Sequence, residues 1–234
     1  MREGLAEARI TGFDPERLAL LTDELLAANG LVEAFIYWQI TRGTPPWESG
    51  IQRPRVTKQR LTPTVVGFAC AVPAVKTFED PEVKRVALRP DTRWSRGRLK
   101  SISLLGGVLA AFEAEEAGAD DAIMTRGELI TEGTATNVFL YADGRFLTPS
   151  LDSAPMLAGV TRQLLIEENP TIDQRPVRAA ELLEADEVML VGTRTMVASV
   201  THVDGKPIGG GQPGPRSREL LATLRRAIRR DVER

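Results

Sequence analysis

Residues 99–123 read LKSISLLGGVLAAFEAEEAGADDAI, and this stretch decides the fold. Its apolar residues recur at helical spacing, at Ile102, Leu105, Leu109 and Phe112. Gly118 follows the run as a helix-terminating residue. The pattern predicts a helix that begins near Lys100, preceded by a charged connecting loop over residues 93–99 (RWSRGRL).

Upstream of this loop, the chain predicts a small domain of mixed helices and strands over residues 1–92. A first helix is expected through about Arg9, and a second from Asp14-Pro15 to Gly30, because these residues favour a helix start and a helix end. Stretches rich in β-branched and aromatic residues or bounded by proline predict strands at residues 31–41, 62–72 and 85–88.

Downstream of the loop, alternating strand and helix signals predict a larger domain over residues 93–234. The expected strands and turns are 122–125, 129–131, a hairpin on Asp143-Gly144, 188–191 and a hairpin on Asp204-Gly205. Helices are expected from about Thr161, over 179–185 and at the arginine-rich C-terminus. The fold class is therefore expected to be α+β.

The composition argues against several classes of partner. Thirty basic and 32 acidic residues leave a net charge of −2, which provides no field for nucleic acid or an anionic membrane. With one cysteine and one histidine, the chain favours neither a disulfide framework nor a zinc site. No apolar run reaches the roughly 18 residues of a membrane span. We expect a cytoplasmic protein that binds a small molecule.

Two side chains stand out chemically. Lys100 lies where the charged loop meets the apolar helix, and nearby positive charge or burial would make its amine nucleophilic. Glu132 lies in a loop of small residues, TEGTATN (residues 131–137), between two expected strands. Taken singly, each has an ordinary alternative, a solvated lysine at a helix start and an exposed glutamate in a turn. Two further segments could hold a phosphate, residues 157–161 before a helix and Gly192-Thr193 after a strand.

The order of these segments is more specific than any one of them. The segment around Lys100 is followed by ITEGTATNVF (130–139), MLAGVTRQLL (156–165), ADEVMLVGT (185–193) and VDGKPIGGGQPGP (203–215). This succession closely resembles the aminotransferase class IV family over residues 31–222. The resemblance implies fold type IV, with a small α/β domain, a larger pseudo-barrel domain and pyridoxal 5′-phosphate (PLP) between them. It also implies a homodimer whose subunits complete each other's sites.

The resemblance assigns roles to particular residues. Lys100 would carry PLP and act in turn as base and acid toward the substrate, and Glu132 would keep the pyridine nitrogen protonated. Leu157 matches the leucine that packs on the ring. The phosphate cradle matches Val160, Thr161 and Thr193, with Gly192 beside them and Thr136 as a further member. The expected reaction moves an amino group between an amino acid, branched-chain or D-amino-acid-like, or an amine and a 2-oxo acid.

Two departures from the family pattern affect these expectations. Family members usually have about fifty more N-terminal residues, whose arginine grips the phosphate through paired hydrogen bonds. Aligned on REGLAEARI, this chain begins just beyond that arginine, so it is expected to be truncated relative to the family. The D-amino-acid motif Pro-Arg-x-His is also absent after Arg42, where TPPWES (residues 44–49) follows. Arg42, Trp47 and Arg194 are therefore the substrate candidates. A lyase of the aminodeoxychorismate type and a non-catalytic interaction module are the alternatives.

Overall fold

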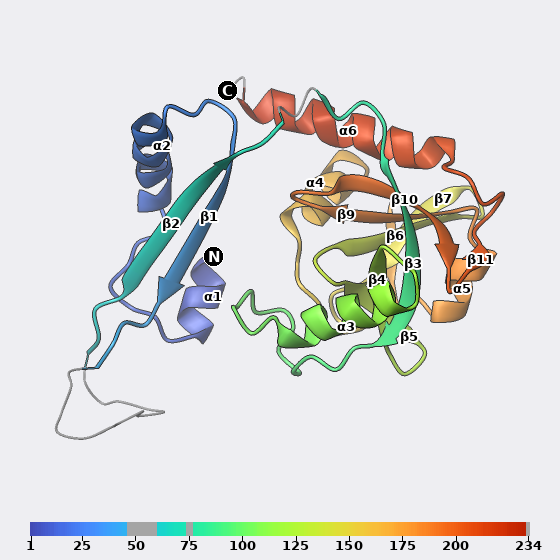
Figure 1. The fold of residues 1–234 in the computed structure, drawn as a ribbon, viewed down its shortest axis with the longest axis horizontal. Coiled ribbons are helices and arrows are strands. Elements are labelled where there is room, and N and C mark those ends of the chain that lie inside the picture. Colours follow the sequence, from blue (N-terminus) through green and yellow to red (C-terminus); the bar gives the residue numbers. More distant parts are fainter. Residues whose placement is uncertain (46–59, 74–76, 233–234) are drawn as a thin grey trace. The chain divides into compact units, whose positions relative to one another are not determined.

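The computed structural model describes residues 1–45, 60–73 and 77–232, and it divides into two compact units, Met1–Thr77 and Phe78–Arg234 (Figure 1). The domain boundary expected near residue 92 stays a prediction, and the compact units divide at Thr77. The reason is that the third strand, β3 (Glu82–Pro90), pairs with strands of the second unit. In the described part of the chain, no helix has the length and apolar character needed to cross a bilayer.

The first unit contains the helical pair and two of the strands that the sequence predicts, and in the structure these strands pair antiparallel. Its elements are α1 (Arg2–Glu7), α2 (Arg17–Asn29), β1 (Ala34–Thr41) and β2 (Thr64–Ala71). The two strands pair from Ala34 opposite Ala71 to Thr41 opposite Thr64. Gly30 ends α2 in the left-handed conformation, as expected for a glycine at that position.

The second unit carries all of the remaining elements (Figure 1). They are β3 (Glu82–Pro90), α3 (Leu105–Glu116), β4 (Asp121–Arg126), β5 (Leu129–Gly133), β6 (Asn137–Ala142), β7 (Arg145–Pro149), α4 (Val160–Glu168), β8 (Asp173–Arg175), α5 (Ala179–Glu184), β9 (Glu187–Gly192), β10 (Met196–Val203), β11 (Lys206–Pro207) and α6 (Pro215–Val232). Each strand, hairpin and helix expected downstream of residue 118 is confirmed, within a few residues at its ends.

Within the described part of this unit, nine strands form one sheet in the order β5-β4-β3-β10-β9-β6-β7-β8, with β11 on β10. The sheet is curled, and the segment that follows β8 lies against β5 at the other end of the sheet. Past β8, the chain returns to β5, where the Ile130 amide donates to the Val177 carbonyl at 2.9 Å. The Ala179 amide likewise donates to the carbonyl of Glu128 at 2.8 Å. The curl creates an interior that has to be filled by side chains.

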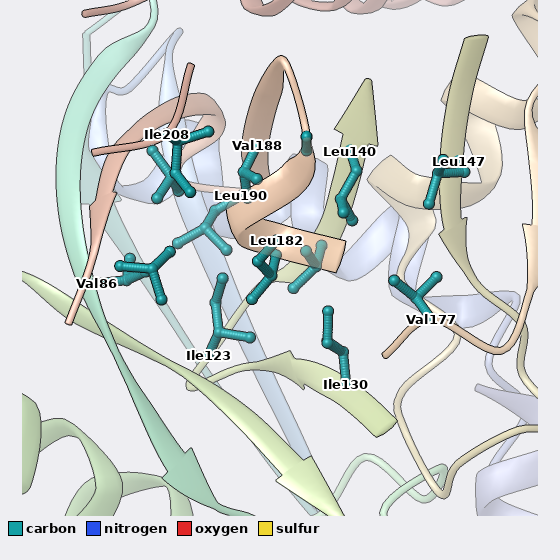
Figure 2. Packing of buried hydrophobic residues seen from close by; sticks show 14 of the residues in the cluster. Val86, Ile123, Ile130, Leu140, Leu147, Val177, Leu182, Val188, Leu190 and Ile208 are labelled. Atoms are coloured by element: carbon teal, nitrogen blue, oxygen red, sulfur yellow. The ribbon is translucent and has the colours of Figure 1, made fainter. Parts of the chain in front are cut away.

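The interior is filled from the sheet and from α5. Leu182 of α5 is fully buried and lies among inward-facing side chains such as Ile123 and Leu190 (Figure 2). Because strand side chains alternate, Ala122 and Met124 point to the opposite face, where α3 covers them. Both faces are covered, which explains why strands such as β9 read as continuous apolar runs.

Helix α3 begins later than predicted, and it buries its small residues rather than its large apolar ones. It begins at Leu105, so Lys100 lies in the preceding loop rather than at the helix start. Its large apolar residues are not the ones that pack on the sheet, because Leu105, Leu109 and Phe112 are 69%, 46% and 56% exposed. The small residues Gly107, Ala110 and Ala114 are buried instead. Their size allows the helix backbone to approach β3 and β4 closely.

Candidate active site

Glu132 occupies the end of β5, and its side chain is 6% exposed. Three groups converge on its carboxylate. Arg93 Nη1 donates to Oε1, the Leu157 amide donates to Oε2 at 3.1 Å, and Asn137 Nδ2 donates to the same oxygen at 3.3 Å. A carboxylate has about four lone-pair positions, so this one can accept a further N–H donor.

Arg93 links Glu132 to a second buried carboxylate. Its Nε and Nη2 donate to the two oxygens of Asp91 at 2.9 and 2.8 Å, in a paired arrangement. The Asp91 side chain is completely enclosed, and Arg126 Nε lies 3.4 Å from its Oδ2. Arg126 also donates to the backbone carbonyl of Arg93 at 2.7 Å, which holds the loop in place.

The electrostatics of the two carboxyl groups differ. Burial raises the pKa of Glu132, while Arg93 and the Leu157 amide oppose the rise and the charge of Asp91 adds to it. Burial would also raise the pKa of Asp91, but its hydrogen bonds to Arg93 and the charges of Arg93 and Arg126 hold it below its ordinary value. A further cationic donor would therefore stabilise the ionised form of Glu132 more than that of Asp91.

Strand register brings Thr136 to Gly192. Asn137 of β6 pairs with Val191 of β9, so the loop before β6 lies against the end of β9. A Cβ atom at Gly192 would lie 3.2 Å from Thr136 Cγ2 and 3.3 Å from the Ala135 carbonyl. Thr136 is buried, and its hydroxyl meets no hydrogen-bond partner within the described residues. A buried hydroxyl left in this way is suited to a polar group from a ligand.

The segment before α4 joins the same site. Asn137 Nδ2 donates to the carbonyl of Leu157 at 3.0 Å, and a Cβ at Gly159 would lie 2.1 Å from Asn137 Oδ1. Gly159 therefore has to be a glycine if this contact is kept. It caps α4, whose first residues are the exposed Val160 and the buried Thr161. The N-terminal amides of a helix favour an anion.

Lys100 itself is exposed, in the loop that follows β3. The backbone of this loop lies against the segment that leads to Leu157. The closeness is seen at Gly97, where an added Cβ atom would lie 1.9 Å from the Pro155 carbonyl oxygen. Thr193 and Arg194 are exposed in the turn between β9 and β10. The structure thus brings Glu132, Leu157 and the start of α4 together around Asn137, and joins Thr136 to Gly192.

The remaining candidates lie elsewhere in the chain. Arg42 follows β1 in the first unit, and Trp47 falls outside the described residues. Across residues 1–45, 60–73 and 77–232, no three His, Cys, Asp or Glu side chains are grouped in a way that could hold a metal ion.

Sequence reasoning missed the roles of Asp91, Arg93 and Asn137. Arg93 belongs to the charged loop that is expected to place positive charge near Lys100, yet it engages two carboxylates. The clustering of charge in DTRWSR (residues 91–96) was a visible signal. Its partner Glu132 is 39 residues away, and no local pattern encodes such a contact.

Comparison with known proteins identifies the family. The family model for amino-transferase class IV matches residues 1–203. The D-alanine aminotransferase of Bacillus licheniformis is 32% identical over 220 residues, which are 92% of this chain and 75% of that protein. That of Staphylococcus haemolyticus is 34% identical over 214 residues, 89% of this chain and 73% of that protein. The chain spans about three quarters of the length of these relatives.

Solved structures agree on the fold. A branched-chain amino acid aminotransferase from Thermobaculum terrenum (M3 mutant) superimposes with a TM-score of 0.82 at 21% identity, covering 96% of this chain and 74% of that one. The branched-chain aminotransferase from Thermoproteus uzoniensis with norvaline gives 0.78 at 24% identity, covering 96% and 75%. The fold is thus that of the fold type IV PLP enzymes. The chain belongs to the aminotransferase class IV family, and its relatives named D-alanine aminotransferase and branched-chain aminotransferase are PLP-dependent transaminases.

Proposed function

We propose that the chain moves an amino group between an amino acid, branched-chain or D-amino-acid-like, or an amine and a 2-oxo acid. The observation that carries the proposal is the buried Glu132 carboxylate, which three donors orient and which can accept one more. A protonated pyridine nitrogen is a donor of the required kind. Family membership supports the same reaction class.

The residues of the second unit fit PLP. When bound, PLP supplies an electron sink for the substrate's α-carbon. Glu132 would hold the proton on the ring nitrogen, and Leu157, fixed by its backbone bonds to Glu132 and Asn137, would pack on the ring. The Thr136 hydroxyl, which has no partner among the residues that the structure describes, supports a phosphate site. Its other members are proposed to be Val160, Thr161, Gly192 and Thr193.

Lys100 is the proposed base and acid. Lys100 is exposed on a loop whose start is held by the contact of Arg126 with the Arg93 carbonyl, and an exposed lysine can reach a ligand. We propose Arg42, Trp47 and Arg194 as substrate contacts. Each offers either a cation for a carboxylate or, in Trp47, an apolar surface for a side chain.

The test is a transamination assay of the full chain with PLP and 2-oxoglutarate, offering D-alanine, L-leucine and a simple primary amine separately. We expect glutamate to form with at least one donor. Catalytic turnover of an aminodeoxychorismate-like substrate with no 2-oxo acid present would indicate the lyase instead. If PLP is not bound at all, the interaction-module alternative is favoured and the proposed function is contradicted.

A threonine variant tests the phosphate site. Thr136→Val should change the free energy of unfolding without ligand by less than about 1 kcal/mol, because the lost hydroxyl has no partner among the described residues. The dissociation constant for PLP should rise about tenfold, as expected for one lost hydrogen bond to a charged group. Calorimetry and denaturant unfolding measure the two quantities.

Thr148→Val is the matched control. Its buried hydroxyl already donates to the Val138 carbonyl at 2.7 Å, so its loss should cost stability and leave PLP affinity unchanged. Equal PLP affinity of Thr136→Val and the unaltered chain would remove Thr136 from the phosphate site.

We also propose a homodimer. The proposal is supported by the family resemblance and by an apolar surface on and before α3, whose large side chains are exposed: Ile102, Leu104, Leu105, Val108, Leu109 and Phe112.

Leu109→Arg should shift the chain toward monomer in sedimentation equilibrium. Leu183→Arg on α5, at a comparably exposed leucine, should not. A monomeric unaltered chain would contradict the proposal.

A further inference from the structure

Four charged groups of the second unit alternate in sign along one line of contacts. The order is Glu132, Arg93, Asp91 and Arg126. The side chains of Glu132, Arg93 and Asp91 are 6%, 15% and 0% exposed. That of Arg126, at the end of the line, is 31% exposed. One guanidinium, that of Arg93, therefore serves two buried carboxylates, and the second carboxylate has its own cation on the far side.

The geometry leaves Arg93 little freedom. Asp91 accepts from Arg93 Nε, from Nη2 and from the backbone amide at 2.9, 2.8 and 3.1 Å. These contacts occupy one edge of the guanidinium plane and leave Nη1 for Glu132. The planar group cannot turn toward Asp91 without turning Nη1 relative to Glu132.

The charges of the four groups also indicate that Asp91 affects Glu132 through Arg93. Burying Arg93 against Glu132 alone would place a full positive charge beside the carboxylate that is proposed to hold a ring proton. A neighbouring cation disfavours a second cation at the same carboxylate. Asp91 cancels that charge at contact distance, and Arg126 in turn offsets Asp91 nearer to solvent.

We propose that Asp91 is a positioning residue for this site, which acts through Arg93 to orient and charge-balance Glu132 toward a cationic N–H donor of the ligand. The orientation of Glu132 toward a ligand rests on the proposed function. The electrostatic coupling of Asp91 to Glu132 does not, because it is a property of the ligand-free chain.

The test measures that coupling in the ligand-free chain. With ¹³C-labelled glutamate, the titration midpoint of Glu132 is followed by NMR in Asp91→Asn, Arg126→Gln and the unaltered chain. The charged groups in contact with this carboxylate or with its partner are Arg93, Asp91 and Arg126. Removing the negative charge of Asp91 should lower the midpoint by about one pH unit. Removing the positive charge of Arg126 should raise it, by less.

Glu187→Gln is the matched control. Glu187 is also a buried carboxylate of the sheet, but it accepts from the backbone amides of Arg216 and Ser217 at the start of α6. Its loss should lower the melting temperature and leave the Glu132 midpoint unchanged. If Asp91→Asn behaves in the same way, Asp91 is only structural and the proposal is overturned. Should Asp91→Asn not fold, an unchanged midpoint in Arg126→Gln would overturn it equally.

The second readout concerns the ligand. 4′-Deoxypyridoxine 5′-phosphate, which lacks the aldehyde, is bound with a ¹⁵N-labelled ring, and the pH at which the nitrogen loses its proton is measured. Asp91→Asn should lower this pH by about one unit, because the site becomes more positive by one charge. An unchanged value would overturn the ligand part. Failure of the unaltered chain to bind the analogue would contradict the proposed function, while the ligand-free titration still decides the coupling.

Discussion

Replacing Lys100 with alanine is expected to abolish the borohydride-stable attachment of PLP and to reduce transamination by more than about 10⁴-fold, because both the covalent link and the proton transfer are lost. The experiment is reduction of the PLP-treated chain followed by intact-mass and peptide mass spectrometry. The chain has only five lysines, at positions 58, 76, 84, 100 and 206, so the labelled peptide is unambiguous.

Two other lysines are the controls for this result. Lys206 is exposed at the start of β11, and the Nζ atom of Lys84 in β3 lies 3.8 Å from Glu82 Oε2. Lys206→Ala and Lys84→Ala should retain the full mass increment and near-normal turnover. An increment that survives in Lys100→Ala would show that another amine carries the cofactor, and the catalytic assignment would be lost.

Exchanging Glu132 for glutamine is expected to reduce kcat by roughly 10²- to 10³-fold, within the range of losses seen when one preorganised electrostatic contact at a reacting system is removed. The amide keeps nearly the same shape, but it has no negative charge with which to hold a proton on the ring nitrogen. It also leaves Arg93 facing only one carboxylate. Steady-state kinetics and the ¹⁵N signal of the bound analogue measure the two consequences.

Glu187→Gln controls for the general cost of neutralising a buried carboxylate. It should lower stability while kcat stays within about twofold, because its partners are helix amides remote in sequence from the site. A kcat for Glu132→Gln that is equal to that of this control would rule out Glu132 as the partner of the ring nitrogen.

Local patterns predicted most of the secondary structure. Alternation and turn residues placed β4 to β7 and the turn on Asp143-Gly144, since these depend on neighbours a few residues away. The domain boundary did not follow from such patterns. A strand looks the same in sequence whichever sheet it joins, and β3 joined the larger one.

The helix after Lys100 shows the limit of periodicity. Its large apolar residues repeat at the helical period, yet Gly107, Ala110 and Ala114 make the buried face. Hydrophobic spacing identifies a helix, but it cannot tell which of two apolar stripes packs on a sheet. Close approach of the helix backbone to the sheet favours burial of the stripe of small residues. The large side chains then stay exposed and are available to pack against another surface.

By itself, the amino-acid sequence determined the family, the residue types available for chemistry and the order in which they occur, because these are carried by spacing along the chain. Tertiary structure alone decided which of them meet. The curl of the sheet and the β6–β9 register set Thr136 beside Gly192, and burial forced the charges of Asp91, Arg93 and Glu132 to satisfy one another. Such contacts depend on long-range packing and on the low dielectric of the interior, neither of which can be found in a local stretch of residues.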